Sequence, residues 1–234
     1  MMHCPLRPSR RRWLRRALRG VLATAGALAL GALPAGHAAA DDASKAAATA
    51  APVILVVGDS ISAGYGLANG EGWVHLLEAR LAKQGYRYRV VNASISGDTT
   101  AGGRARLPAL LARDKPAIVL IELGGNDALR GGDLGATRAN LDAMIRAAQS
   151  AGAKVVLVGL QLPPNYGSAY VQRFSALYAD LAHVRHVALV PFVFAGFAED
   201  LSAFQPDRIH PTAASQPRIL DNVWPVLAPL LQRR

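Results

Sequence analysis

The chain alternates between short apolar runs and longer segments with helical periodicity. Residues 53–57 are all apolar and mostly β-branched, and they lead directly into Gly58, Asp59 and Ser60. A continuous apolar run of this length predicts a strand buried on both faces, as in a parallel sheet. The same pattern predicts further strands at 88–93, 117–123, 154–160 and 187–190.

Segments with helical spacing separate these runs. Residues 72–84 place Trp73, Leu77 and Leu81 on one face, and further helices are predicted at 100–113, 134–151, 170–182 and 216–232. Strands that alternate with helices need right-handed crossovers, which cover both faces of a parallel sheet. The pattern therefore predicts an α/β fold, a three-layer α/β/α sandwich of the doubly wound, flavodoxin-like type.

Residues 1–40 have the composition of a cleavable export signal. Seven arginines and no acid precede residue 20, an apolar run covers 21–33, and Ala38-Ala39-Ala40 stands before Asp41. This order predicts cleavage after Ala40 and a periplasmic or secreted protein. The apolar run is too short and too rich in glycine to span a membrane, so no stable membrane anchor is expected. Residues 9–15 resemble a twin-arginine signal, and an arginine-rich Sec signal is the alternative.

Removal of the signal changes what the composition implies. The whole chain carries 26 Lys+Arg against 16 Asp+Glu, but without the seven signal arginines the net charge falls from +10 to +3. The basic character thus belongs largely to the signal, and no nucleic-acid partner is predicted. The single cysteine, Cys4, leaves as well, so no disulfide, thiolate metal site or cysteine nucleophile is expected. Residues 41–51 are expected to be a flexible lead-in, and 52–234 a single domain.

Small and polar residues gather where the predicted strands end. They occur at 58–60, 92–99 and 124–127, and a further pair, Asp207 and His210, stands just before the terminal helix. The carboxyl ends of parallel strands meet at one edge of a sheet, so these segments are expected to lie together. In isolation, Ser60 could equally cap the following helix.

The combination has the parts that acyl transfer needs. Ser60 requires a base to become a nucleophile, His210 can take its proton near neutral pH, and Asp207 can orient the imidazole. The negative charge of a tetrahedral intermediate needs fixed donors. The backbone N–H groups of Ser60 and Gly97 and the side-chain amide of Asn126 are suitable.

At this level of detail the sequence resembles the SGNH (GDSL-type) hydrolase superfamily. The blocks are Gly-Asp-Ser at 58–60, a later glycine at Gly97, Gly-x-Asn-Asp at 124–127 and Asp-x-x-His at 207–210. The flanking segments GDSISAGYG, ELGGNDALRG and LPPNYG are similar to the periplasmic multifunctional thioesterases, arylesterases and lysophospholipases of Gram-negative bacteria. The resemblance covers nearly all of 51–231.

The resemblance implies a function and assigns roles. Ser60, Asp207 and His210 become the catalytic triad, and Ser60, Gly97 and Asn126 the oxyanion hole. It further implies a five-stranded parallel sheet, a monomer without metal or cofactor, and small acyl esters or thioesters as substrates, such as acyl-CoA, aryl esters and lysophospholipids. Arg208 departs from the pattern, because glycine is expected there in close relatives. Beside the catalytic histidine, its charge is expected to favour anionic leaving groups such as CoA.

Two alternatives stay open at this point. A non-catalytic or phosphate-binding flavodoxin-like module could use the same sheet edge, but it would not need the pair Asp207 and His210. Within the superfamily, a carbohydrate acetyl-esterase shares the same blocks. An acyl groove should have the apolar wall that the resemblance suggests beside the loop 163–167, formed by Leu129, Leu160, Leu162 and Ile209.

The other polar candidates are expected to be structural. Asp59 and Asp98 are interpreted as capping or loop-bracing residues, and Asp127 as a brace for the turn at 124–127. His75 falls within a predicted helix. The segment 183–186 has two histidines at metal-like spacing, but without an acidic or cysteine partner nearby it is interpreted as a solvated helix end.

Overall fold

Five parallel strands form the sheet at the centre of the molecule. The computed structural model describes residues 51–233. The strand order is β2-β1-β3-β4-β5, and Val56 of β1 pairs with Asn92 of β2 and Leu120 of β3. The strands are β1 Val53–Gly58, β2 Arg89–Asn92, β3 Ile118–Glu122, β4 Lys154–Val158 and β5 Ala188–Val190.

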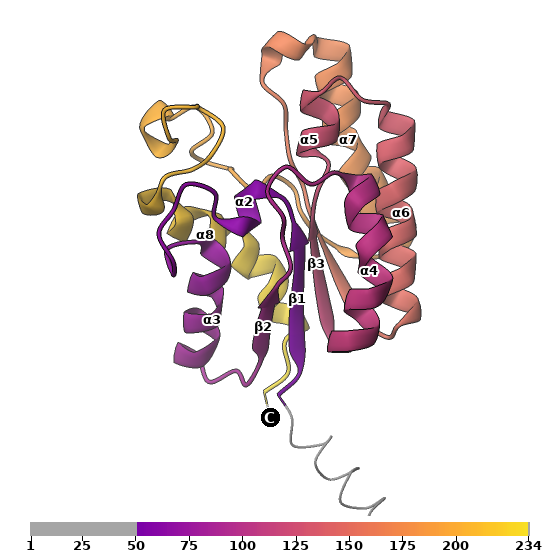
Figure 1. Ribbon diagram of the computed structural model, residues 1–234, viewed down its shortest axis with the longest axis vertical. Helices are drawn as coiled ribbons and strands as arrows, with labels where there is room; N and C mark the ends of the chain where they lie inside the picture. The colour runs from indigo at the N-terminus through magenta and orange to yellow at the C-terminus, as the bar shows by residue number, and fades with distance from the viewer. Residues whose placement is uncertain (1–50, 234) are drawn as a thin grey trace, which may run out of the picture. The chain divides into compact units, whose positions relative to one another are not determined.

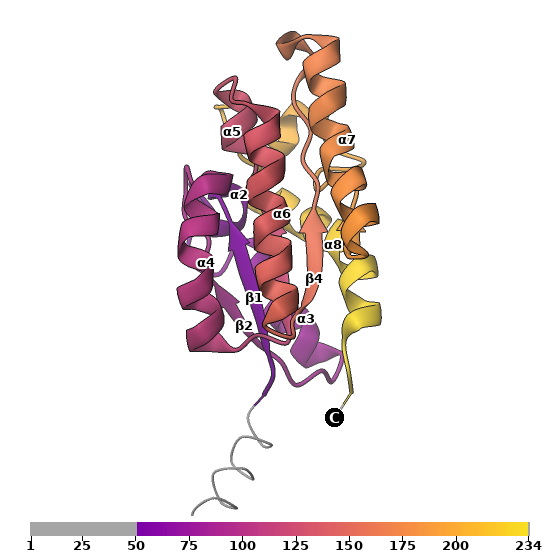
Figure 2. The same cartoon turned by 90° about the vertical axis from the view of Figure 1, so that its right-hand side faces the viewer.

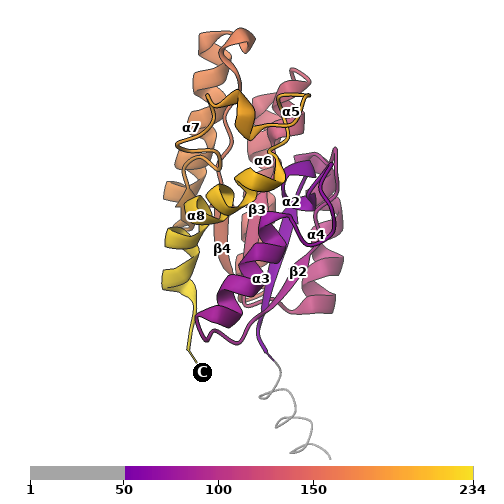
Figure 3. The same ribbon diagram turned by 90° about the vertical axis from the view of Figure 1, so that its left-hand side faces the viewer.

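Helices cover both faces of this sheet. On one face lie α4, α6 and α7, and on the other α3 and α8 (Figures 2 and 3). Within the described residues, no helix is both long and apolar enough to cross a membrane. The helices are α2 Ser60–Ala63, α3 Trp73–Lys83, α4 Thr100–Asp114, α5 Gly125–Leu129, α6 Leu134–Ser150, α7 Ser168–Arg185 and α8 Gln216–Leu227, with 3₁₀ turns at Pro164–Tyr166, Leu201–Ala203, Ala213–Ser215 and Ala228–Leu230.

The central strands β1 and β3 are almost entirely apolar because helices cover both faces of the sheet. Every residue of β1 and β3 is buried, because helices pack on both faces. A strand enclosed in this way needs an apolar side chain at nearly every position, which is why the two strands lack the alternation of a half-exposed strand. The predicted three-layer sandwich with five parallel strands is confirmed.

Some boundaries differ from the predicted ones. The terminal helix α8 ends at Leu227 rather than at 232, because Pro229 has no N–H to donate to the carbonyl of Pro225. The short helices α2 and α5 were not predicted, since four or five residues are too few to show a periodicity. The predicted signal at 1–40 and the lead-in at 41–51 lie outside the described residues, apart from Ala51.

The topology brings the polar segments to one edge of the sheet. Helix α2 begins after β1 and α5 begins after β3, both at the carboxyl ends of their strands (Figure 1). Strand β1 lies beside β3, and the chain leaves β1 and β3 toward opposite faces, to α3 and α6 (Figures 2 and 3). Doubly wound sheets bind their ligands at such a switch point. Ser60 lies directly at it.

A buried carboxyl group ties two of these strand ends together. Glu122, the last residue of β3, is fully buried, and its Oε2 accepts hydrogen bonds from Ser62 Oγ at 2.8 Å and from Asp59 N–H at 3.4 Å. Burial raises the pKa of Glu122 well above its ordinary value of 4.5, and the nearby Asp59 carboxylate adds to this increase. Glu122 escaped the sequence analysis because it ends an otherwise apolar run.

The protonation of Glu122 should make stability depend on pH. A carboxyl group with a raised pKa keeps its proton in the folded chain while the unfolded chain loses it. The free energy of unfolding therefore falls as pH rises above the ordinary pKa. Glu122→Gln keeps an acceptor for Ser62 and removes the titration.

We expect the free energy of unfolding of the wild type to fall by roughly 1 kcal/mol per pH unit relative to Glu122→Gln as the pH rises above about 5. Urea unfolding of both proteins at each pH measures the difference. Parallel stability profiles would show that Glu122 is not the titrating group.

Candidate active site

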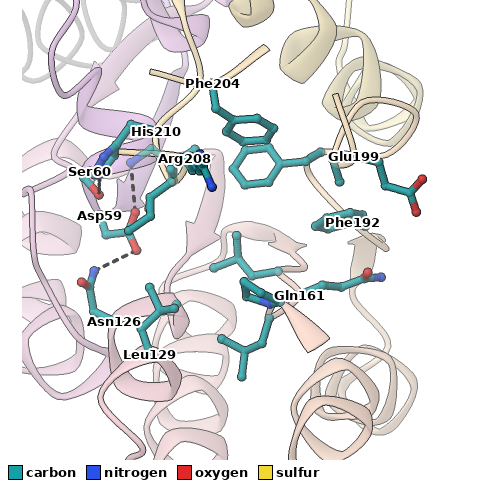
Figure 4. A pocket seen from close by; sticks show the side chains of 18 of the residues that line it. Asp59, Ser60, Asn126, Leu129, Gln161, Phe192, Glu199, Phe204, Arg208 and His210 are labelled. Carbon is teal, nitrogen blue, oxygen red and sulfur yellow. Dashed lines mark hydrogen bonds between the residues drawn. The ribbon is translucent and has the colours of Figure 1, made fainter. Parts of the chain in front are cut away.

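The three residues predicted as a triad form one hydrogen-bonded chain. Ser60 is the first residue of α2, whereas Asp207 and His210 lie in the loop before α8. His210 Nε2 is 2.9 Å from Ser60 Oγ (Figure 4). His210 Nδ1 is 2.7 Å from Asp207 Oδ2. One ring nitrogen of the imidazole thus faces the hydroxyl and the other faces the carboxylate, which is the arrangement of a serine nucleophile with an oriented base.

The loop holds Asp207 in place through its own backbone. Asp207 Oδ1 accepts hydrogen bonds from the N–H groups of Ile209 at 2.9 Å and His210 at 3.1 Å. Although partial desolvation of Asp207 favours the neutral form, these bonds and the imidazole lower the pKa of Asp207 to about 2. The carboxylate is therefore ionised at every pH at which His210 can act as a base.

Tyr65 supports the imidazole from the side. Its ring centroid lies 4.5 Å from that of His210, with 40° between the planes. Tyr65 stands between Gly64 and Gly66, both with positive φ, and its carbonyl accepts from Gln205 of the histidine loop at 2.8 Å. Sequence reasoning missed this residue, although an aromatic between two glycines beside the Gly-Asp-Ser block was a usable signal.

Asp59 links the serine turn to Asn126. Its Oδ1 accepts from Ile61 N–H at 3.0 Å and caps α2, and its Oδ2 accepts from Asn126 Nδ2 at 3.1 Å. Burial raises the pKa of Asp59 to about 6, against the opposing effect of these bonds. Gly58 has no space for a side chain, since a Cβ there would lie 2.7 Å from Ser62 Cβ and 2.8 Å from Glu122 Oε2. The capping role predicted for Asp59 is confirmed.

The candidate oxyanion donors are not equivalent. Within residues 51–233, the N–H groups of Ser60 and Gly97 donate to no acceptor. Asn126 Nδ2, in contrast, already donates to Asp59 Oδ2 and to the carbonyl of Asp98 at 3.0 Å. An oxyanion would therefore find two free backbone donors, but it would have to compete for the amide of Asn126.

The remaining acidic candidates brace the site. Asp98 forms an ion pair with Arg106 at 2.8 Å, and Arg106 also donates to the carbonyls of Ala93 and Gly58, so one side chain joins the loops after β1 and β2. The bracing role predicted for Asp98 is confirmed. Asp127 instead fixes the start of α4, because Thr100 donates to it from N–H at 2.9 Å and from Oγ1 at 2.6 Å.

The histidines outside the triad lie apart from this site. His75 is exposed on α3, and His183 and His186 are exposed at the end of α7. Residues 51–233 contain no group of three His, Cys, Asp or Glu side chains that could hold a metal ion.

A cavity of about 450 Å³ opens beside the triad. One wall contains Leu129, Leu160 and Leu162 with Pro163 and Pro164, and Ile209 lies near the triad, so the four apolar residues predicted for a wall all line the cavity. A second, aromatic wall was not predicted and comprises Phe192, Phe194 and Phe204 (Figure 4). Its rings contact edge to face, with Phe194 centroids 5.8 Å from Phe192 and 5.5 Å from Phe204. These phenylalanines come from a loop with no regular spacing, so the sequence pattern could not place them.

Comparison with known proteins places this geometry in context. The model of the GDSL-like lipase/acylhydrolase family matches residues 56–216. "Esterase TesA" of Pseudomonas aeruginosa is 58% identical over 182 residues, which cover 78% of this chain and 90% of that protein. "Thioesterase 1/protease 1/lysophospholipase L1" of Escherichia coli K12 is 42% identical over 184 residues, covering 79% of this chain and 87% of that protein.

Solved structures agree with the sequence matches. A crystal structure of TesA superposes with a TM-score of 0.75 at 58% identity, covering 76% of this chain and 99% of that one. The psychrotrophic esterase EstA from Pseudoalteromonas sp., inhibited by monoethylphosphonate, gives a TM-score of 0.72 at 37% identity, covering 76% and 97%. The resemblance inferred from the four sequence blocks is confirmed: this chain belongs to the GDSL-like lipase/acylhydrolase family.

Proposed function

We propose that the chain cleaves acyl esters and thioesters through an acyl-enzyme formed on Ser60, with Asp207 and His210 completing the triad. The observation that carries this assignment is the unbroken hydrogen-bond chain from Asp207 through His210 to Ser60. Membership of an acylhydrolase family supports the reaction class. A module that only binds a ligand has no use for a base aimed at a serine hydroxyl.

In this proposal the proton moves in a fixed order. His210 Nε2 takes the proton of Ser60 Oγ as the oxygen attacks the acyl carbon, and the Asp207 carboxylate stabilises the resulting imidazolium. The imidazolium then gives that proton to the leaving oxygen or sulfur. Water repeats the sequence on the acyl-enzyme, with His210 as its base, and releases the acid.

In this proposal three hydrogen-bond donors stabilise the negative charge of each tetrahedral intermediate. The N–H groups of Ser60 and Gly97 are free to receive it, and Asn126 Nδ2 adds a third hydrogen bond by turning from Asp59 or Asp98. Gly97 suits its role because its φ of 80° is unfavourable for other residues, and no atom lies within 4 Å of the position that a Cβ would occupy.

The apolar wall suits an acyl chain. The leucine and proline side chains beside Ser60 would cover several methylene groups in the cavity of about 450 Å³. Each buried methylene contributes about 0.8 kcal/mol, or close to fourfold in transition-state binding. A carbohydrate acetyl-esterase would gain nothing from this wall, because its acyl group has two carbons.

The proposal extends to the location of the enzyme. We infer that residues 1–40 direct export, by the twin-arginine or the Sec route, and are removed after Ala40, which leaves a monomer that works in the periplasm or outside the cell. The arginine-rich start, the apolar run and the Ala-Ala-Ala sequence support this.

Removal of the nucleophile tests the assignment. Ser60→Ala should lower kcat for p-nitrophenyl butyrate by roughly 10⁶-fold, as in serine hydrolases whose triad acts as a unit. A fluorophosphonate probe should label the wild type at Ser60 and leave the variant unlabelled. Ser202, an exposed serine outside the cavity, offers a matched control: Ser202→Ala should keep both activity and labelling. A labelled Ser60→Ala protein would refute the proposed nucleophile.

Acyl length separates the proposed substrate class from the acetyl-esterase alternative. We expect kcat/KM for p-nitrophenyl esters to rise up to about fourfold per added methylene from acetate until the wall is covered, and the corresponding CoA thioesters to be hydrolysed as well. Steady-state rates from acetyl to palmitoyl give the profile. A profile that is flat or falls from acetate, with acetylated sugars as the best substrates, would favour the alternative.

A further inference from the structure

Arg208 adopts a backbone conformation that disfavours its own side chain. Its φ is 59°, in the left-handed region, where a Cβ crowds the following carbonyl. The other two non-glycine residues with positive φ among residues 51–233 are Lys115 and His186, which end α4 and α7. Arg208 ends no helix. It closes the turn before His210 by donating its N–H to the carbonyl of Gln205 at 2.8 Å.

The guanidinium of Arg208 has no partner in the described part of the chain. Within residues 51–233 it donates to no carboxylate and no carbonyl, whereas Arg106 and Arg185 are paired with aspartates. It lines the cavity between His210 and Phe204 (Figure 4). Two acids also line the cavity. The Asp59 carboxylate already accepts hydrogen bonds from Ile61 N–H and Asn126 Nδ2, and the Glu199 carboxylate lies on the far side of the aromatic wall in the same view. A strained residue thus presents a free cation to a largely apolar cavity.

The position of Arg208 relative to His210 indicates which part of a substrate it meets. The leaving atom must lie within hydrogen-bonding distance of His210 Nε2, because that nitrogen protonates it. In the proposed function the carbonyl oxygen faces Asn126, and the acyl chain runs along the leucine and proline wall. Arg208 is on the turn that carries His210, so it lies on the side of the leaving group.

We propose that Arg208 is a specificity-determining residue, which binds a carboxylate or phosphate on the leaving group a few bonds from the scissile ester. This inference rests on the proposed function. A guanidinium suits both anions, since it can donate two parallel hydrogen bonds to either. The phosphates of CoA are separated from its thioester by the long pantetheine arm, so they gain less from a side chain this close to the reacting carbon.

Two substrate pairs isolate the anion. The first is 1-octanoylglycerol 3-phosphate against 1-octanoylglycerol, which share the acyl chain and the scissile ester. The second is the butyrate ester of 4-hydroxybenzoate against that of 4-hydroxybenzamide, whose ring could lie on the aromatic wall. In each pair the ratio of kcat/KM, anionic over neutral, is measured for the wild type, Arg208→Gln and Arg173→Gln. Arg173 is exposed on α7 outside the cavity, so its variant controls for the loss of one charge.

Arg208→Gln should lower the ratio by roughly 10- to 100-fold, as expected for one charge-assisted hydrogen-bonded contact, while Arg173→Gln changes it less than about twofold. Arg208→Gly, which suits the positive φ, should give the same loss and serves if the glutamine variant does not fold. If the ratio falls only for the glycerol pair, Arg208 binds the phosphate of a leaving group. If it falls only for the aryl pair, Arg208 binds the carboxylate of an aryl leaving group.

Two results would overturn the inference. If the anionic-over-neutral ratio of Arg208→Gln stays within about twofold of the wild-type ratio in both pairs, Arg208 does not bind the anion. If Arg173→Gln lowers the ratio as much as Arg208→Gln does, the effect comes from the overall charge. A wild type that hydrolyses none of the four esters would instead refute the proposed function.

Discussion

The site depends on the sharp turn that joins β1 to α2. Glu122, at the end of the adjacent strand, accepts from both sides of this turn, and Gly58 lets the two strands' ends approach because it has no side chain. A carboxyl group buried this deeply is costly unless it is neutral or well hydrogen-bonded. Its pKa is raised accordingly, and the serine of the turn directly follows a strand that is buried along its whole length. Precise placement of a nucleophile needs such support.

The two halves of the site are held by different means. Ser60 and Asn126 lie in the first turns of short helices at the ends of the buried strands β1 and β3. Asp59, which precedes Ser60, connects the two turns by a hydrogen bond to Asn126. His210 belongs to a loop whose two ends pair through the bridge between Phe204 and Pro211. Two hydrogen bonds join this loop to the serine side, from Gln205 to the carbonyl of Tyr65 and between His210 and Ser60. Any adjustment to substrates of different size should therefore occur in the histidine loop, where Arg208 also lies.

Much of the fold and the core of the site could be predicted from the sequence. Strands such as β1 and β3 are recognisable because burial on both faces demands apolar residues throughout, and the polar residues at their ends follow from the topology. The buried Glu122, the ring of Tyr65 and the aromatic wall were missed. Each depends on contacts between segments far apart in the chain, which no local periodicity records. Arg208 was noticed as an unexpected cation that could favour anionic leaving groups such as CoA, and its positive φ explains why glycine was expected there.

The central claim is that the hydrogen-bond chain from Asp207 to Ser60 performs the chemistry, and the two aspartates beside the site test it directly. Asp207 orients the catalytic imidazole, whereas Asp98 pairs with Arg106 and braces a loop. Measured by kcat for p-nitrophenyl butyrate, Asp207→Asn should cost roughly 10²–10⁴-fold through the wrong imidazole tautomer, with thermal stability little changed. Asp98→Asn should act mainly on stability and cost far less in kcat. If Asp98→Asn lowers kcat more than Asp207→Asn does, the account of the triad is wrong.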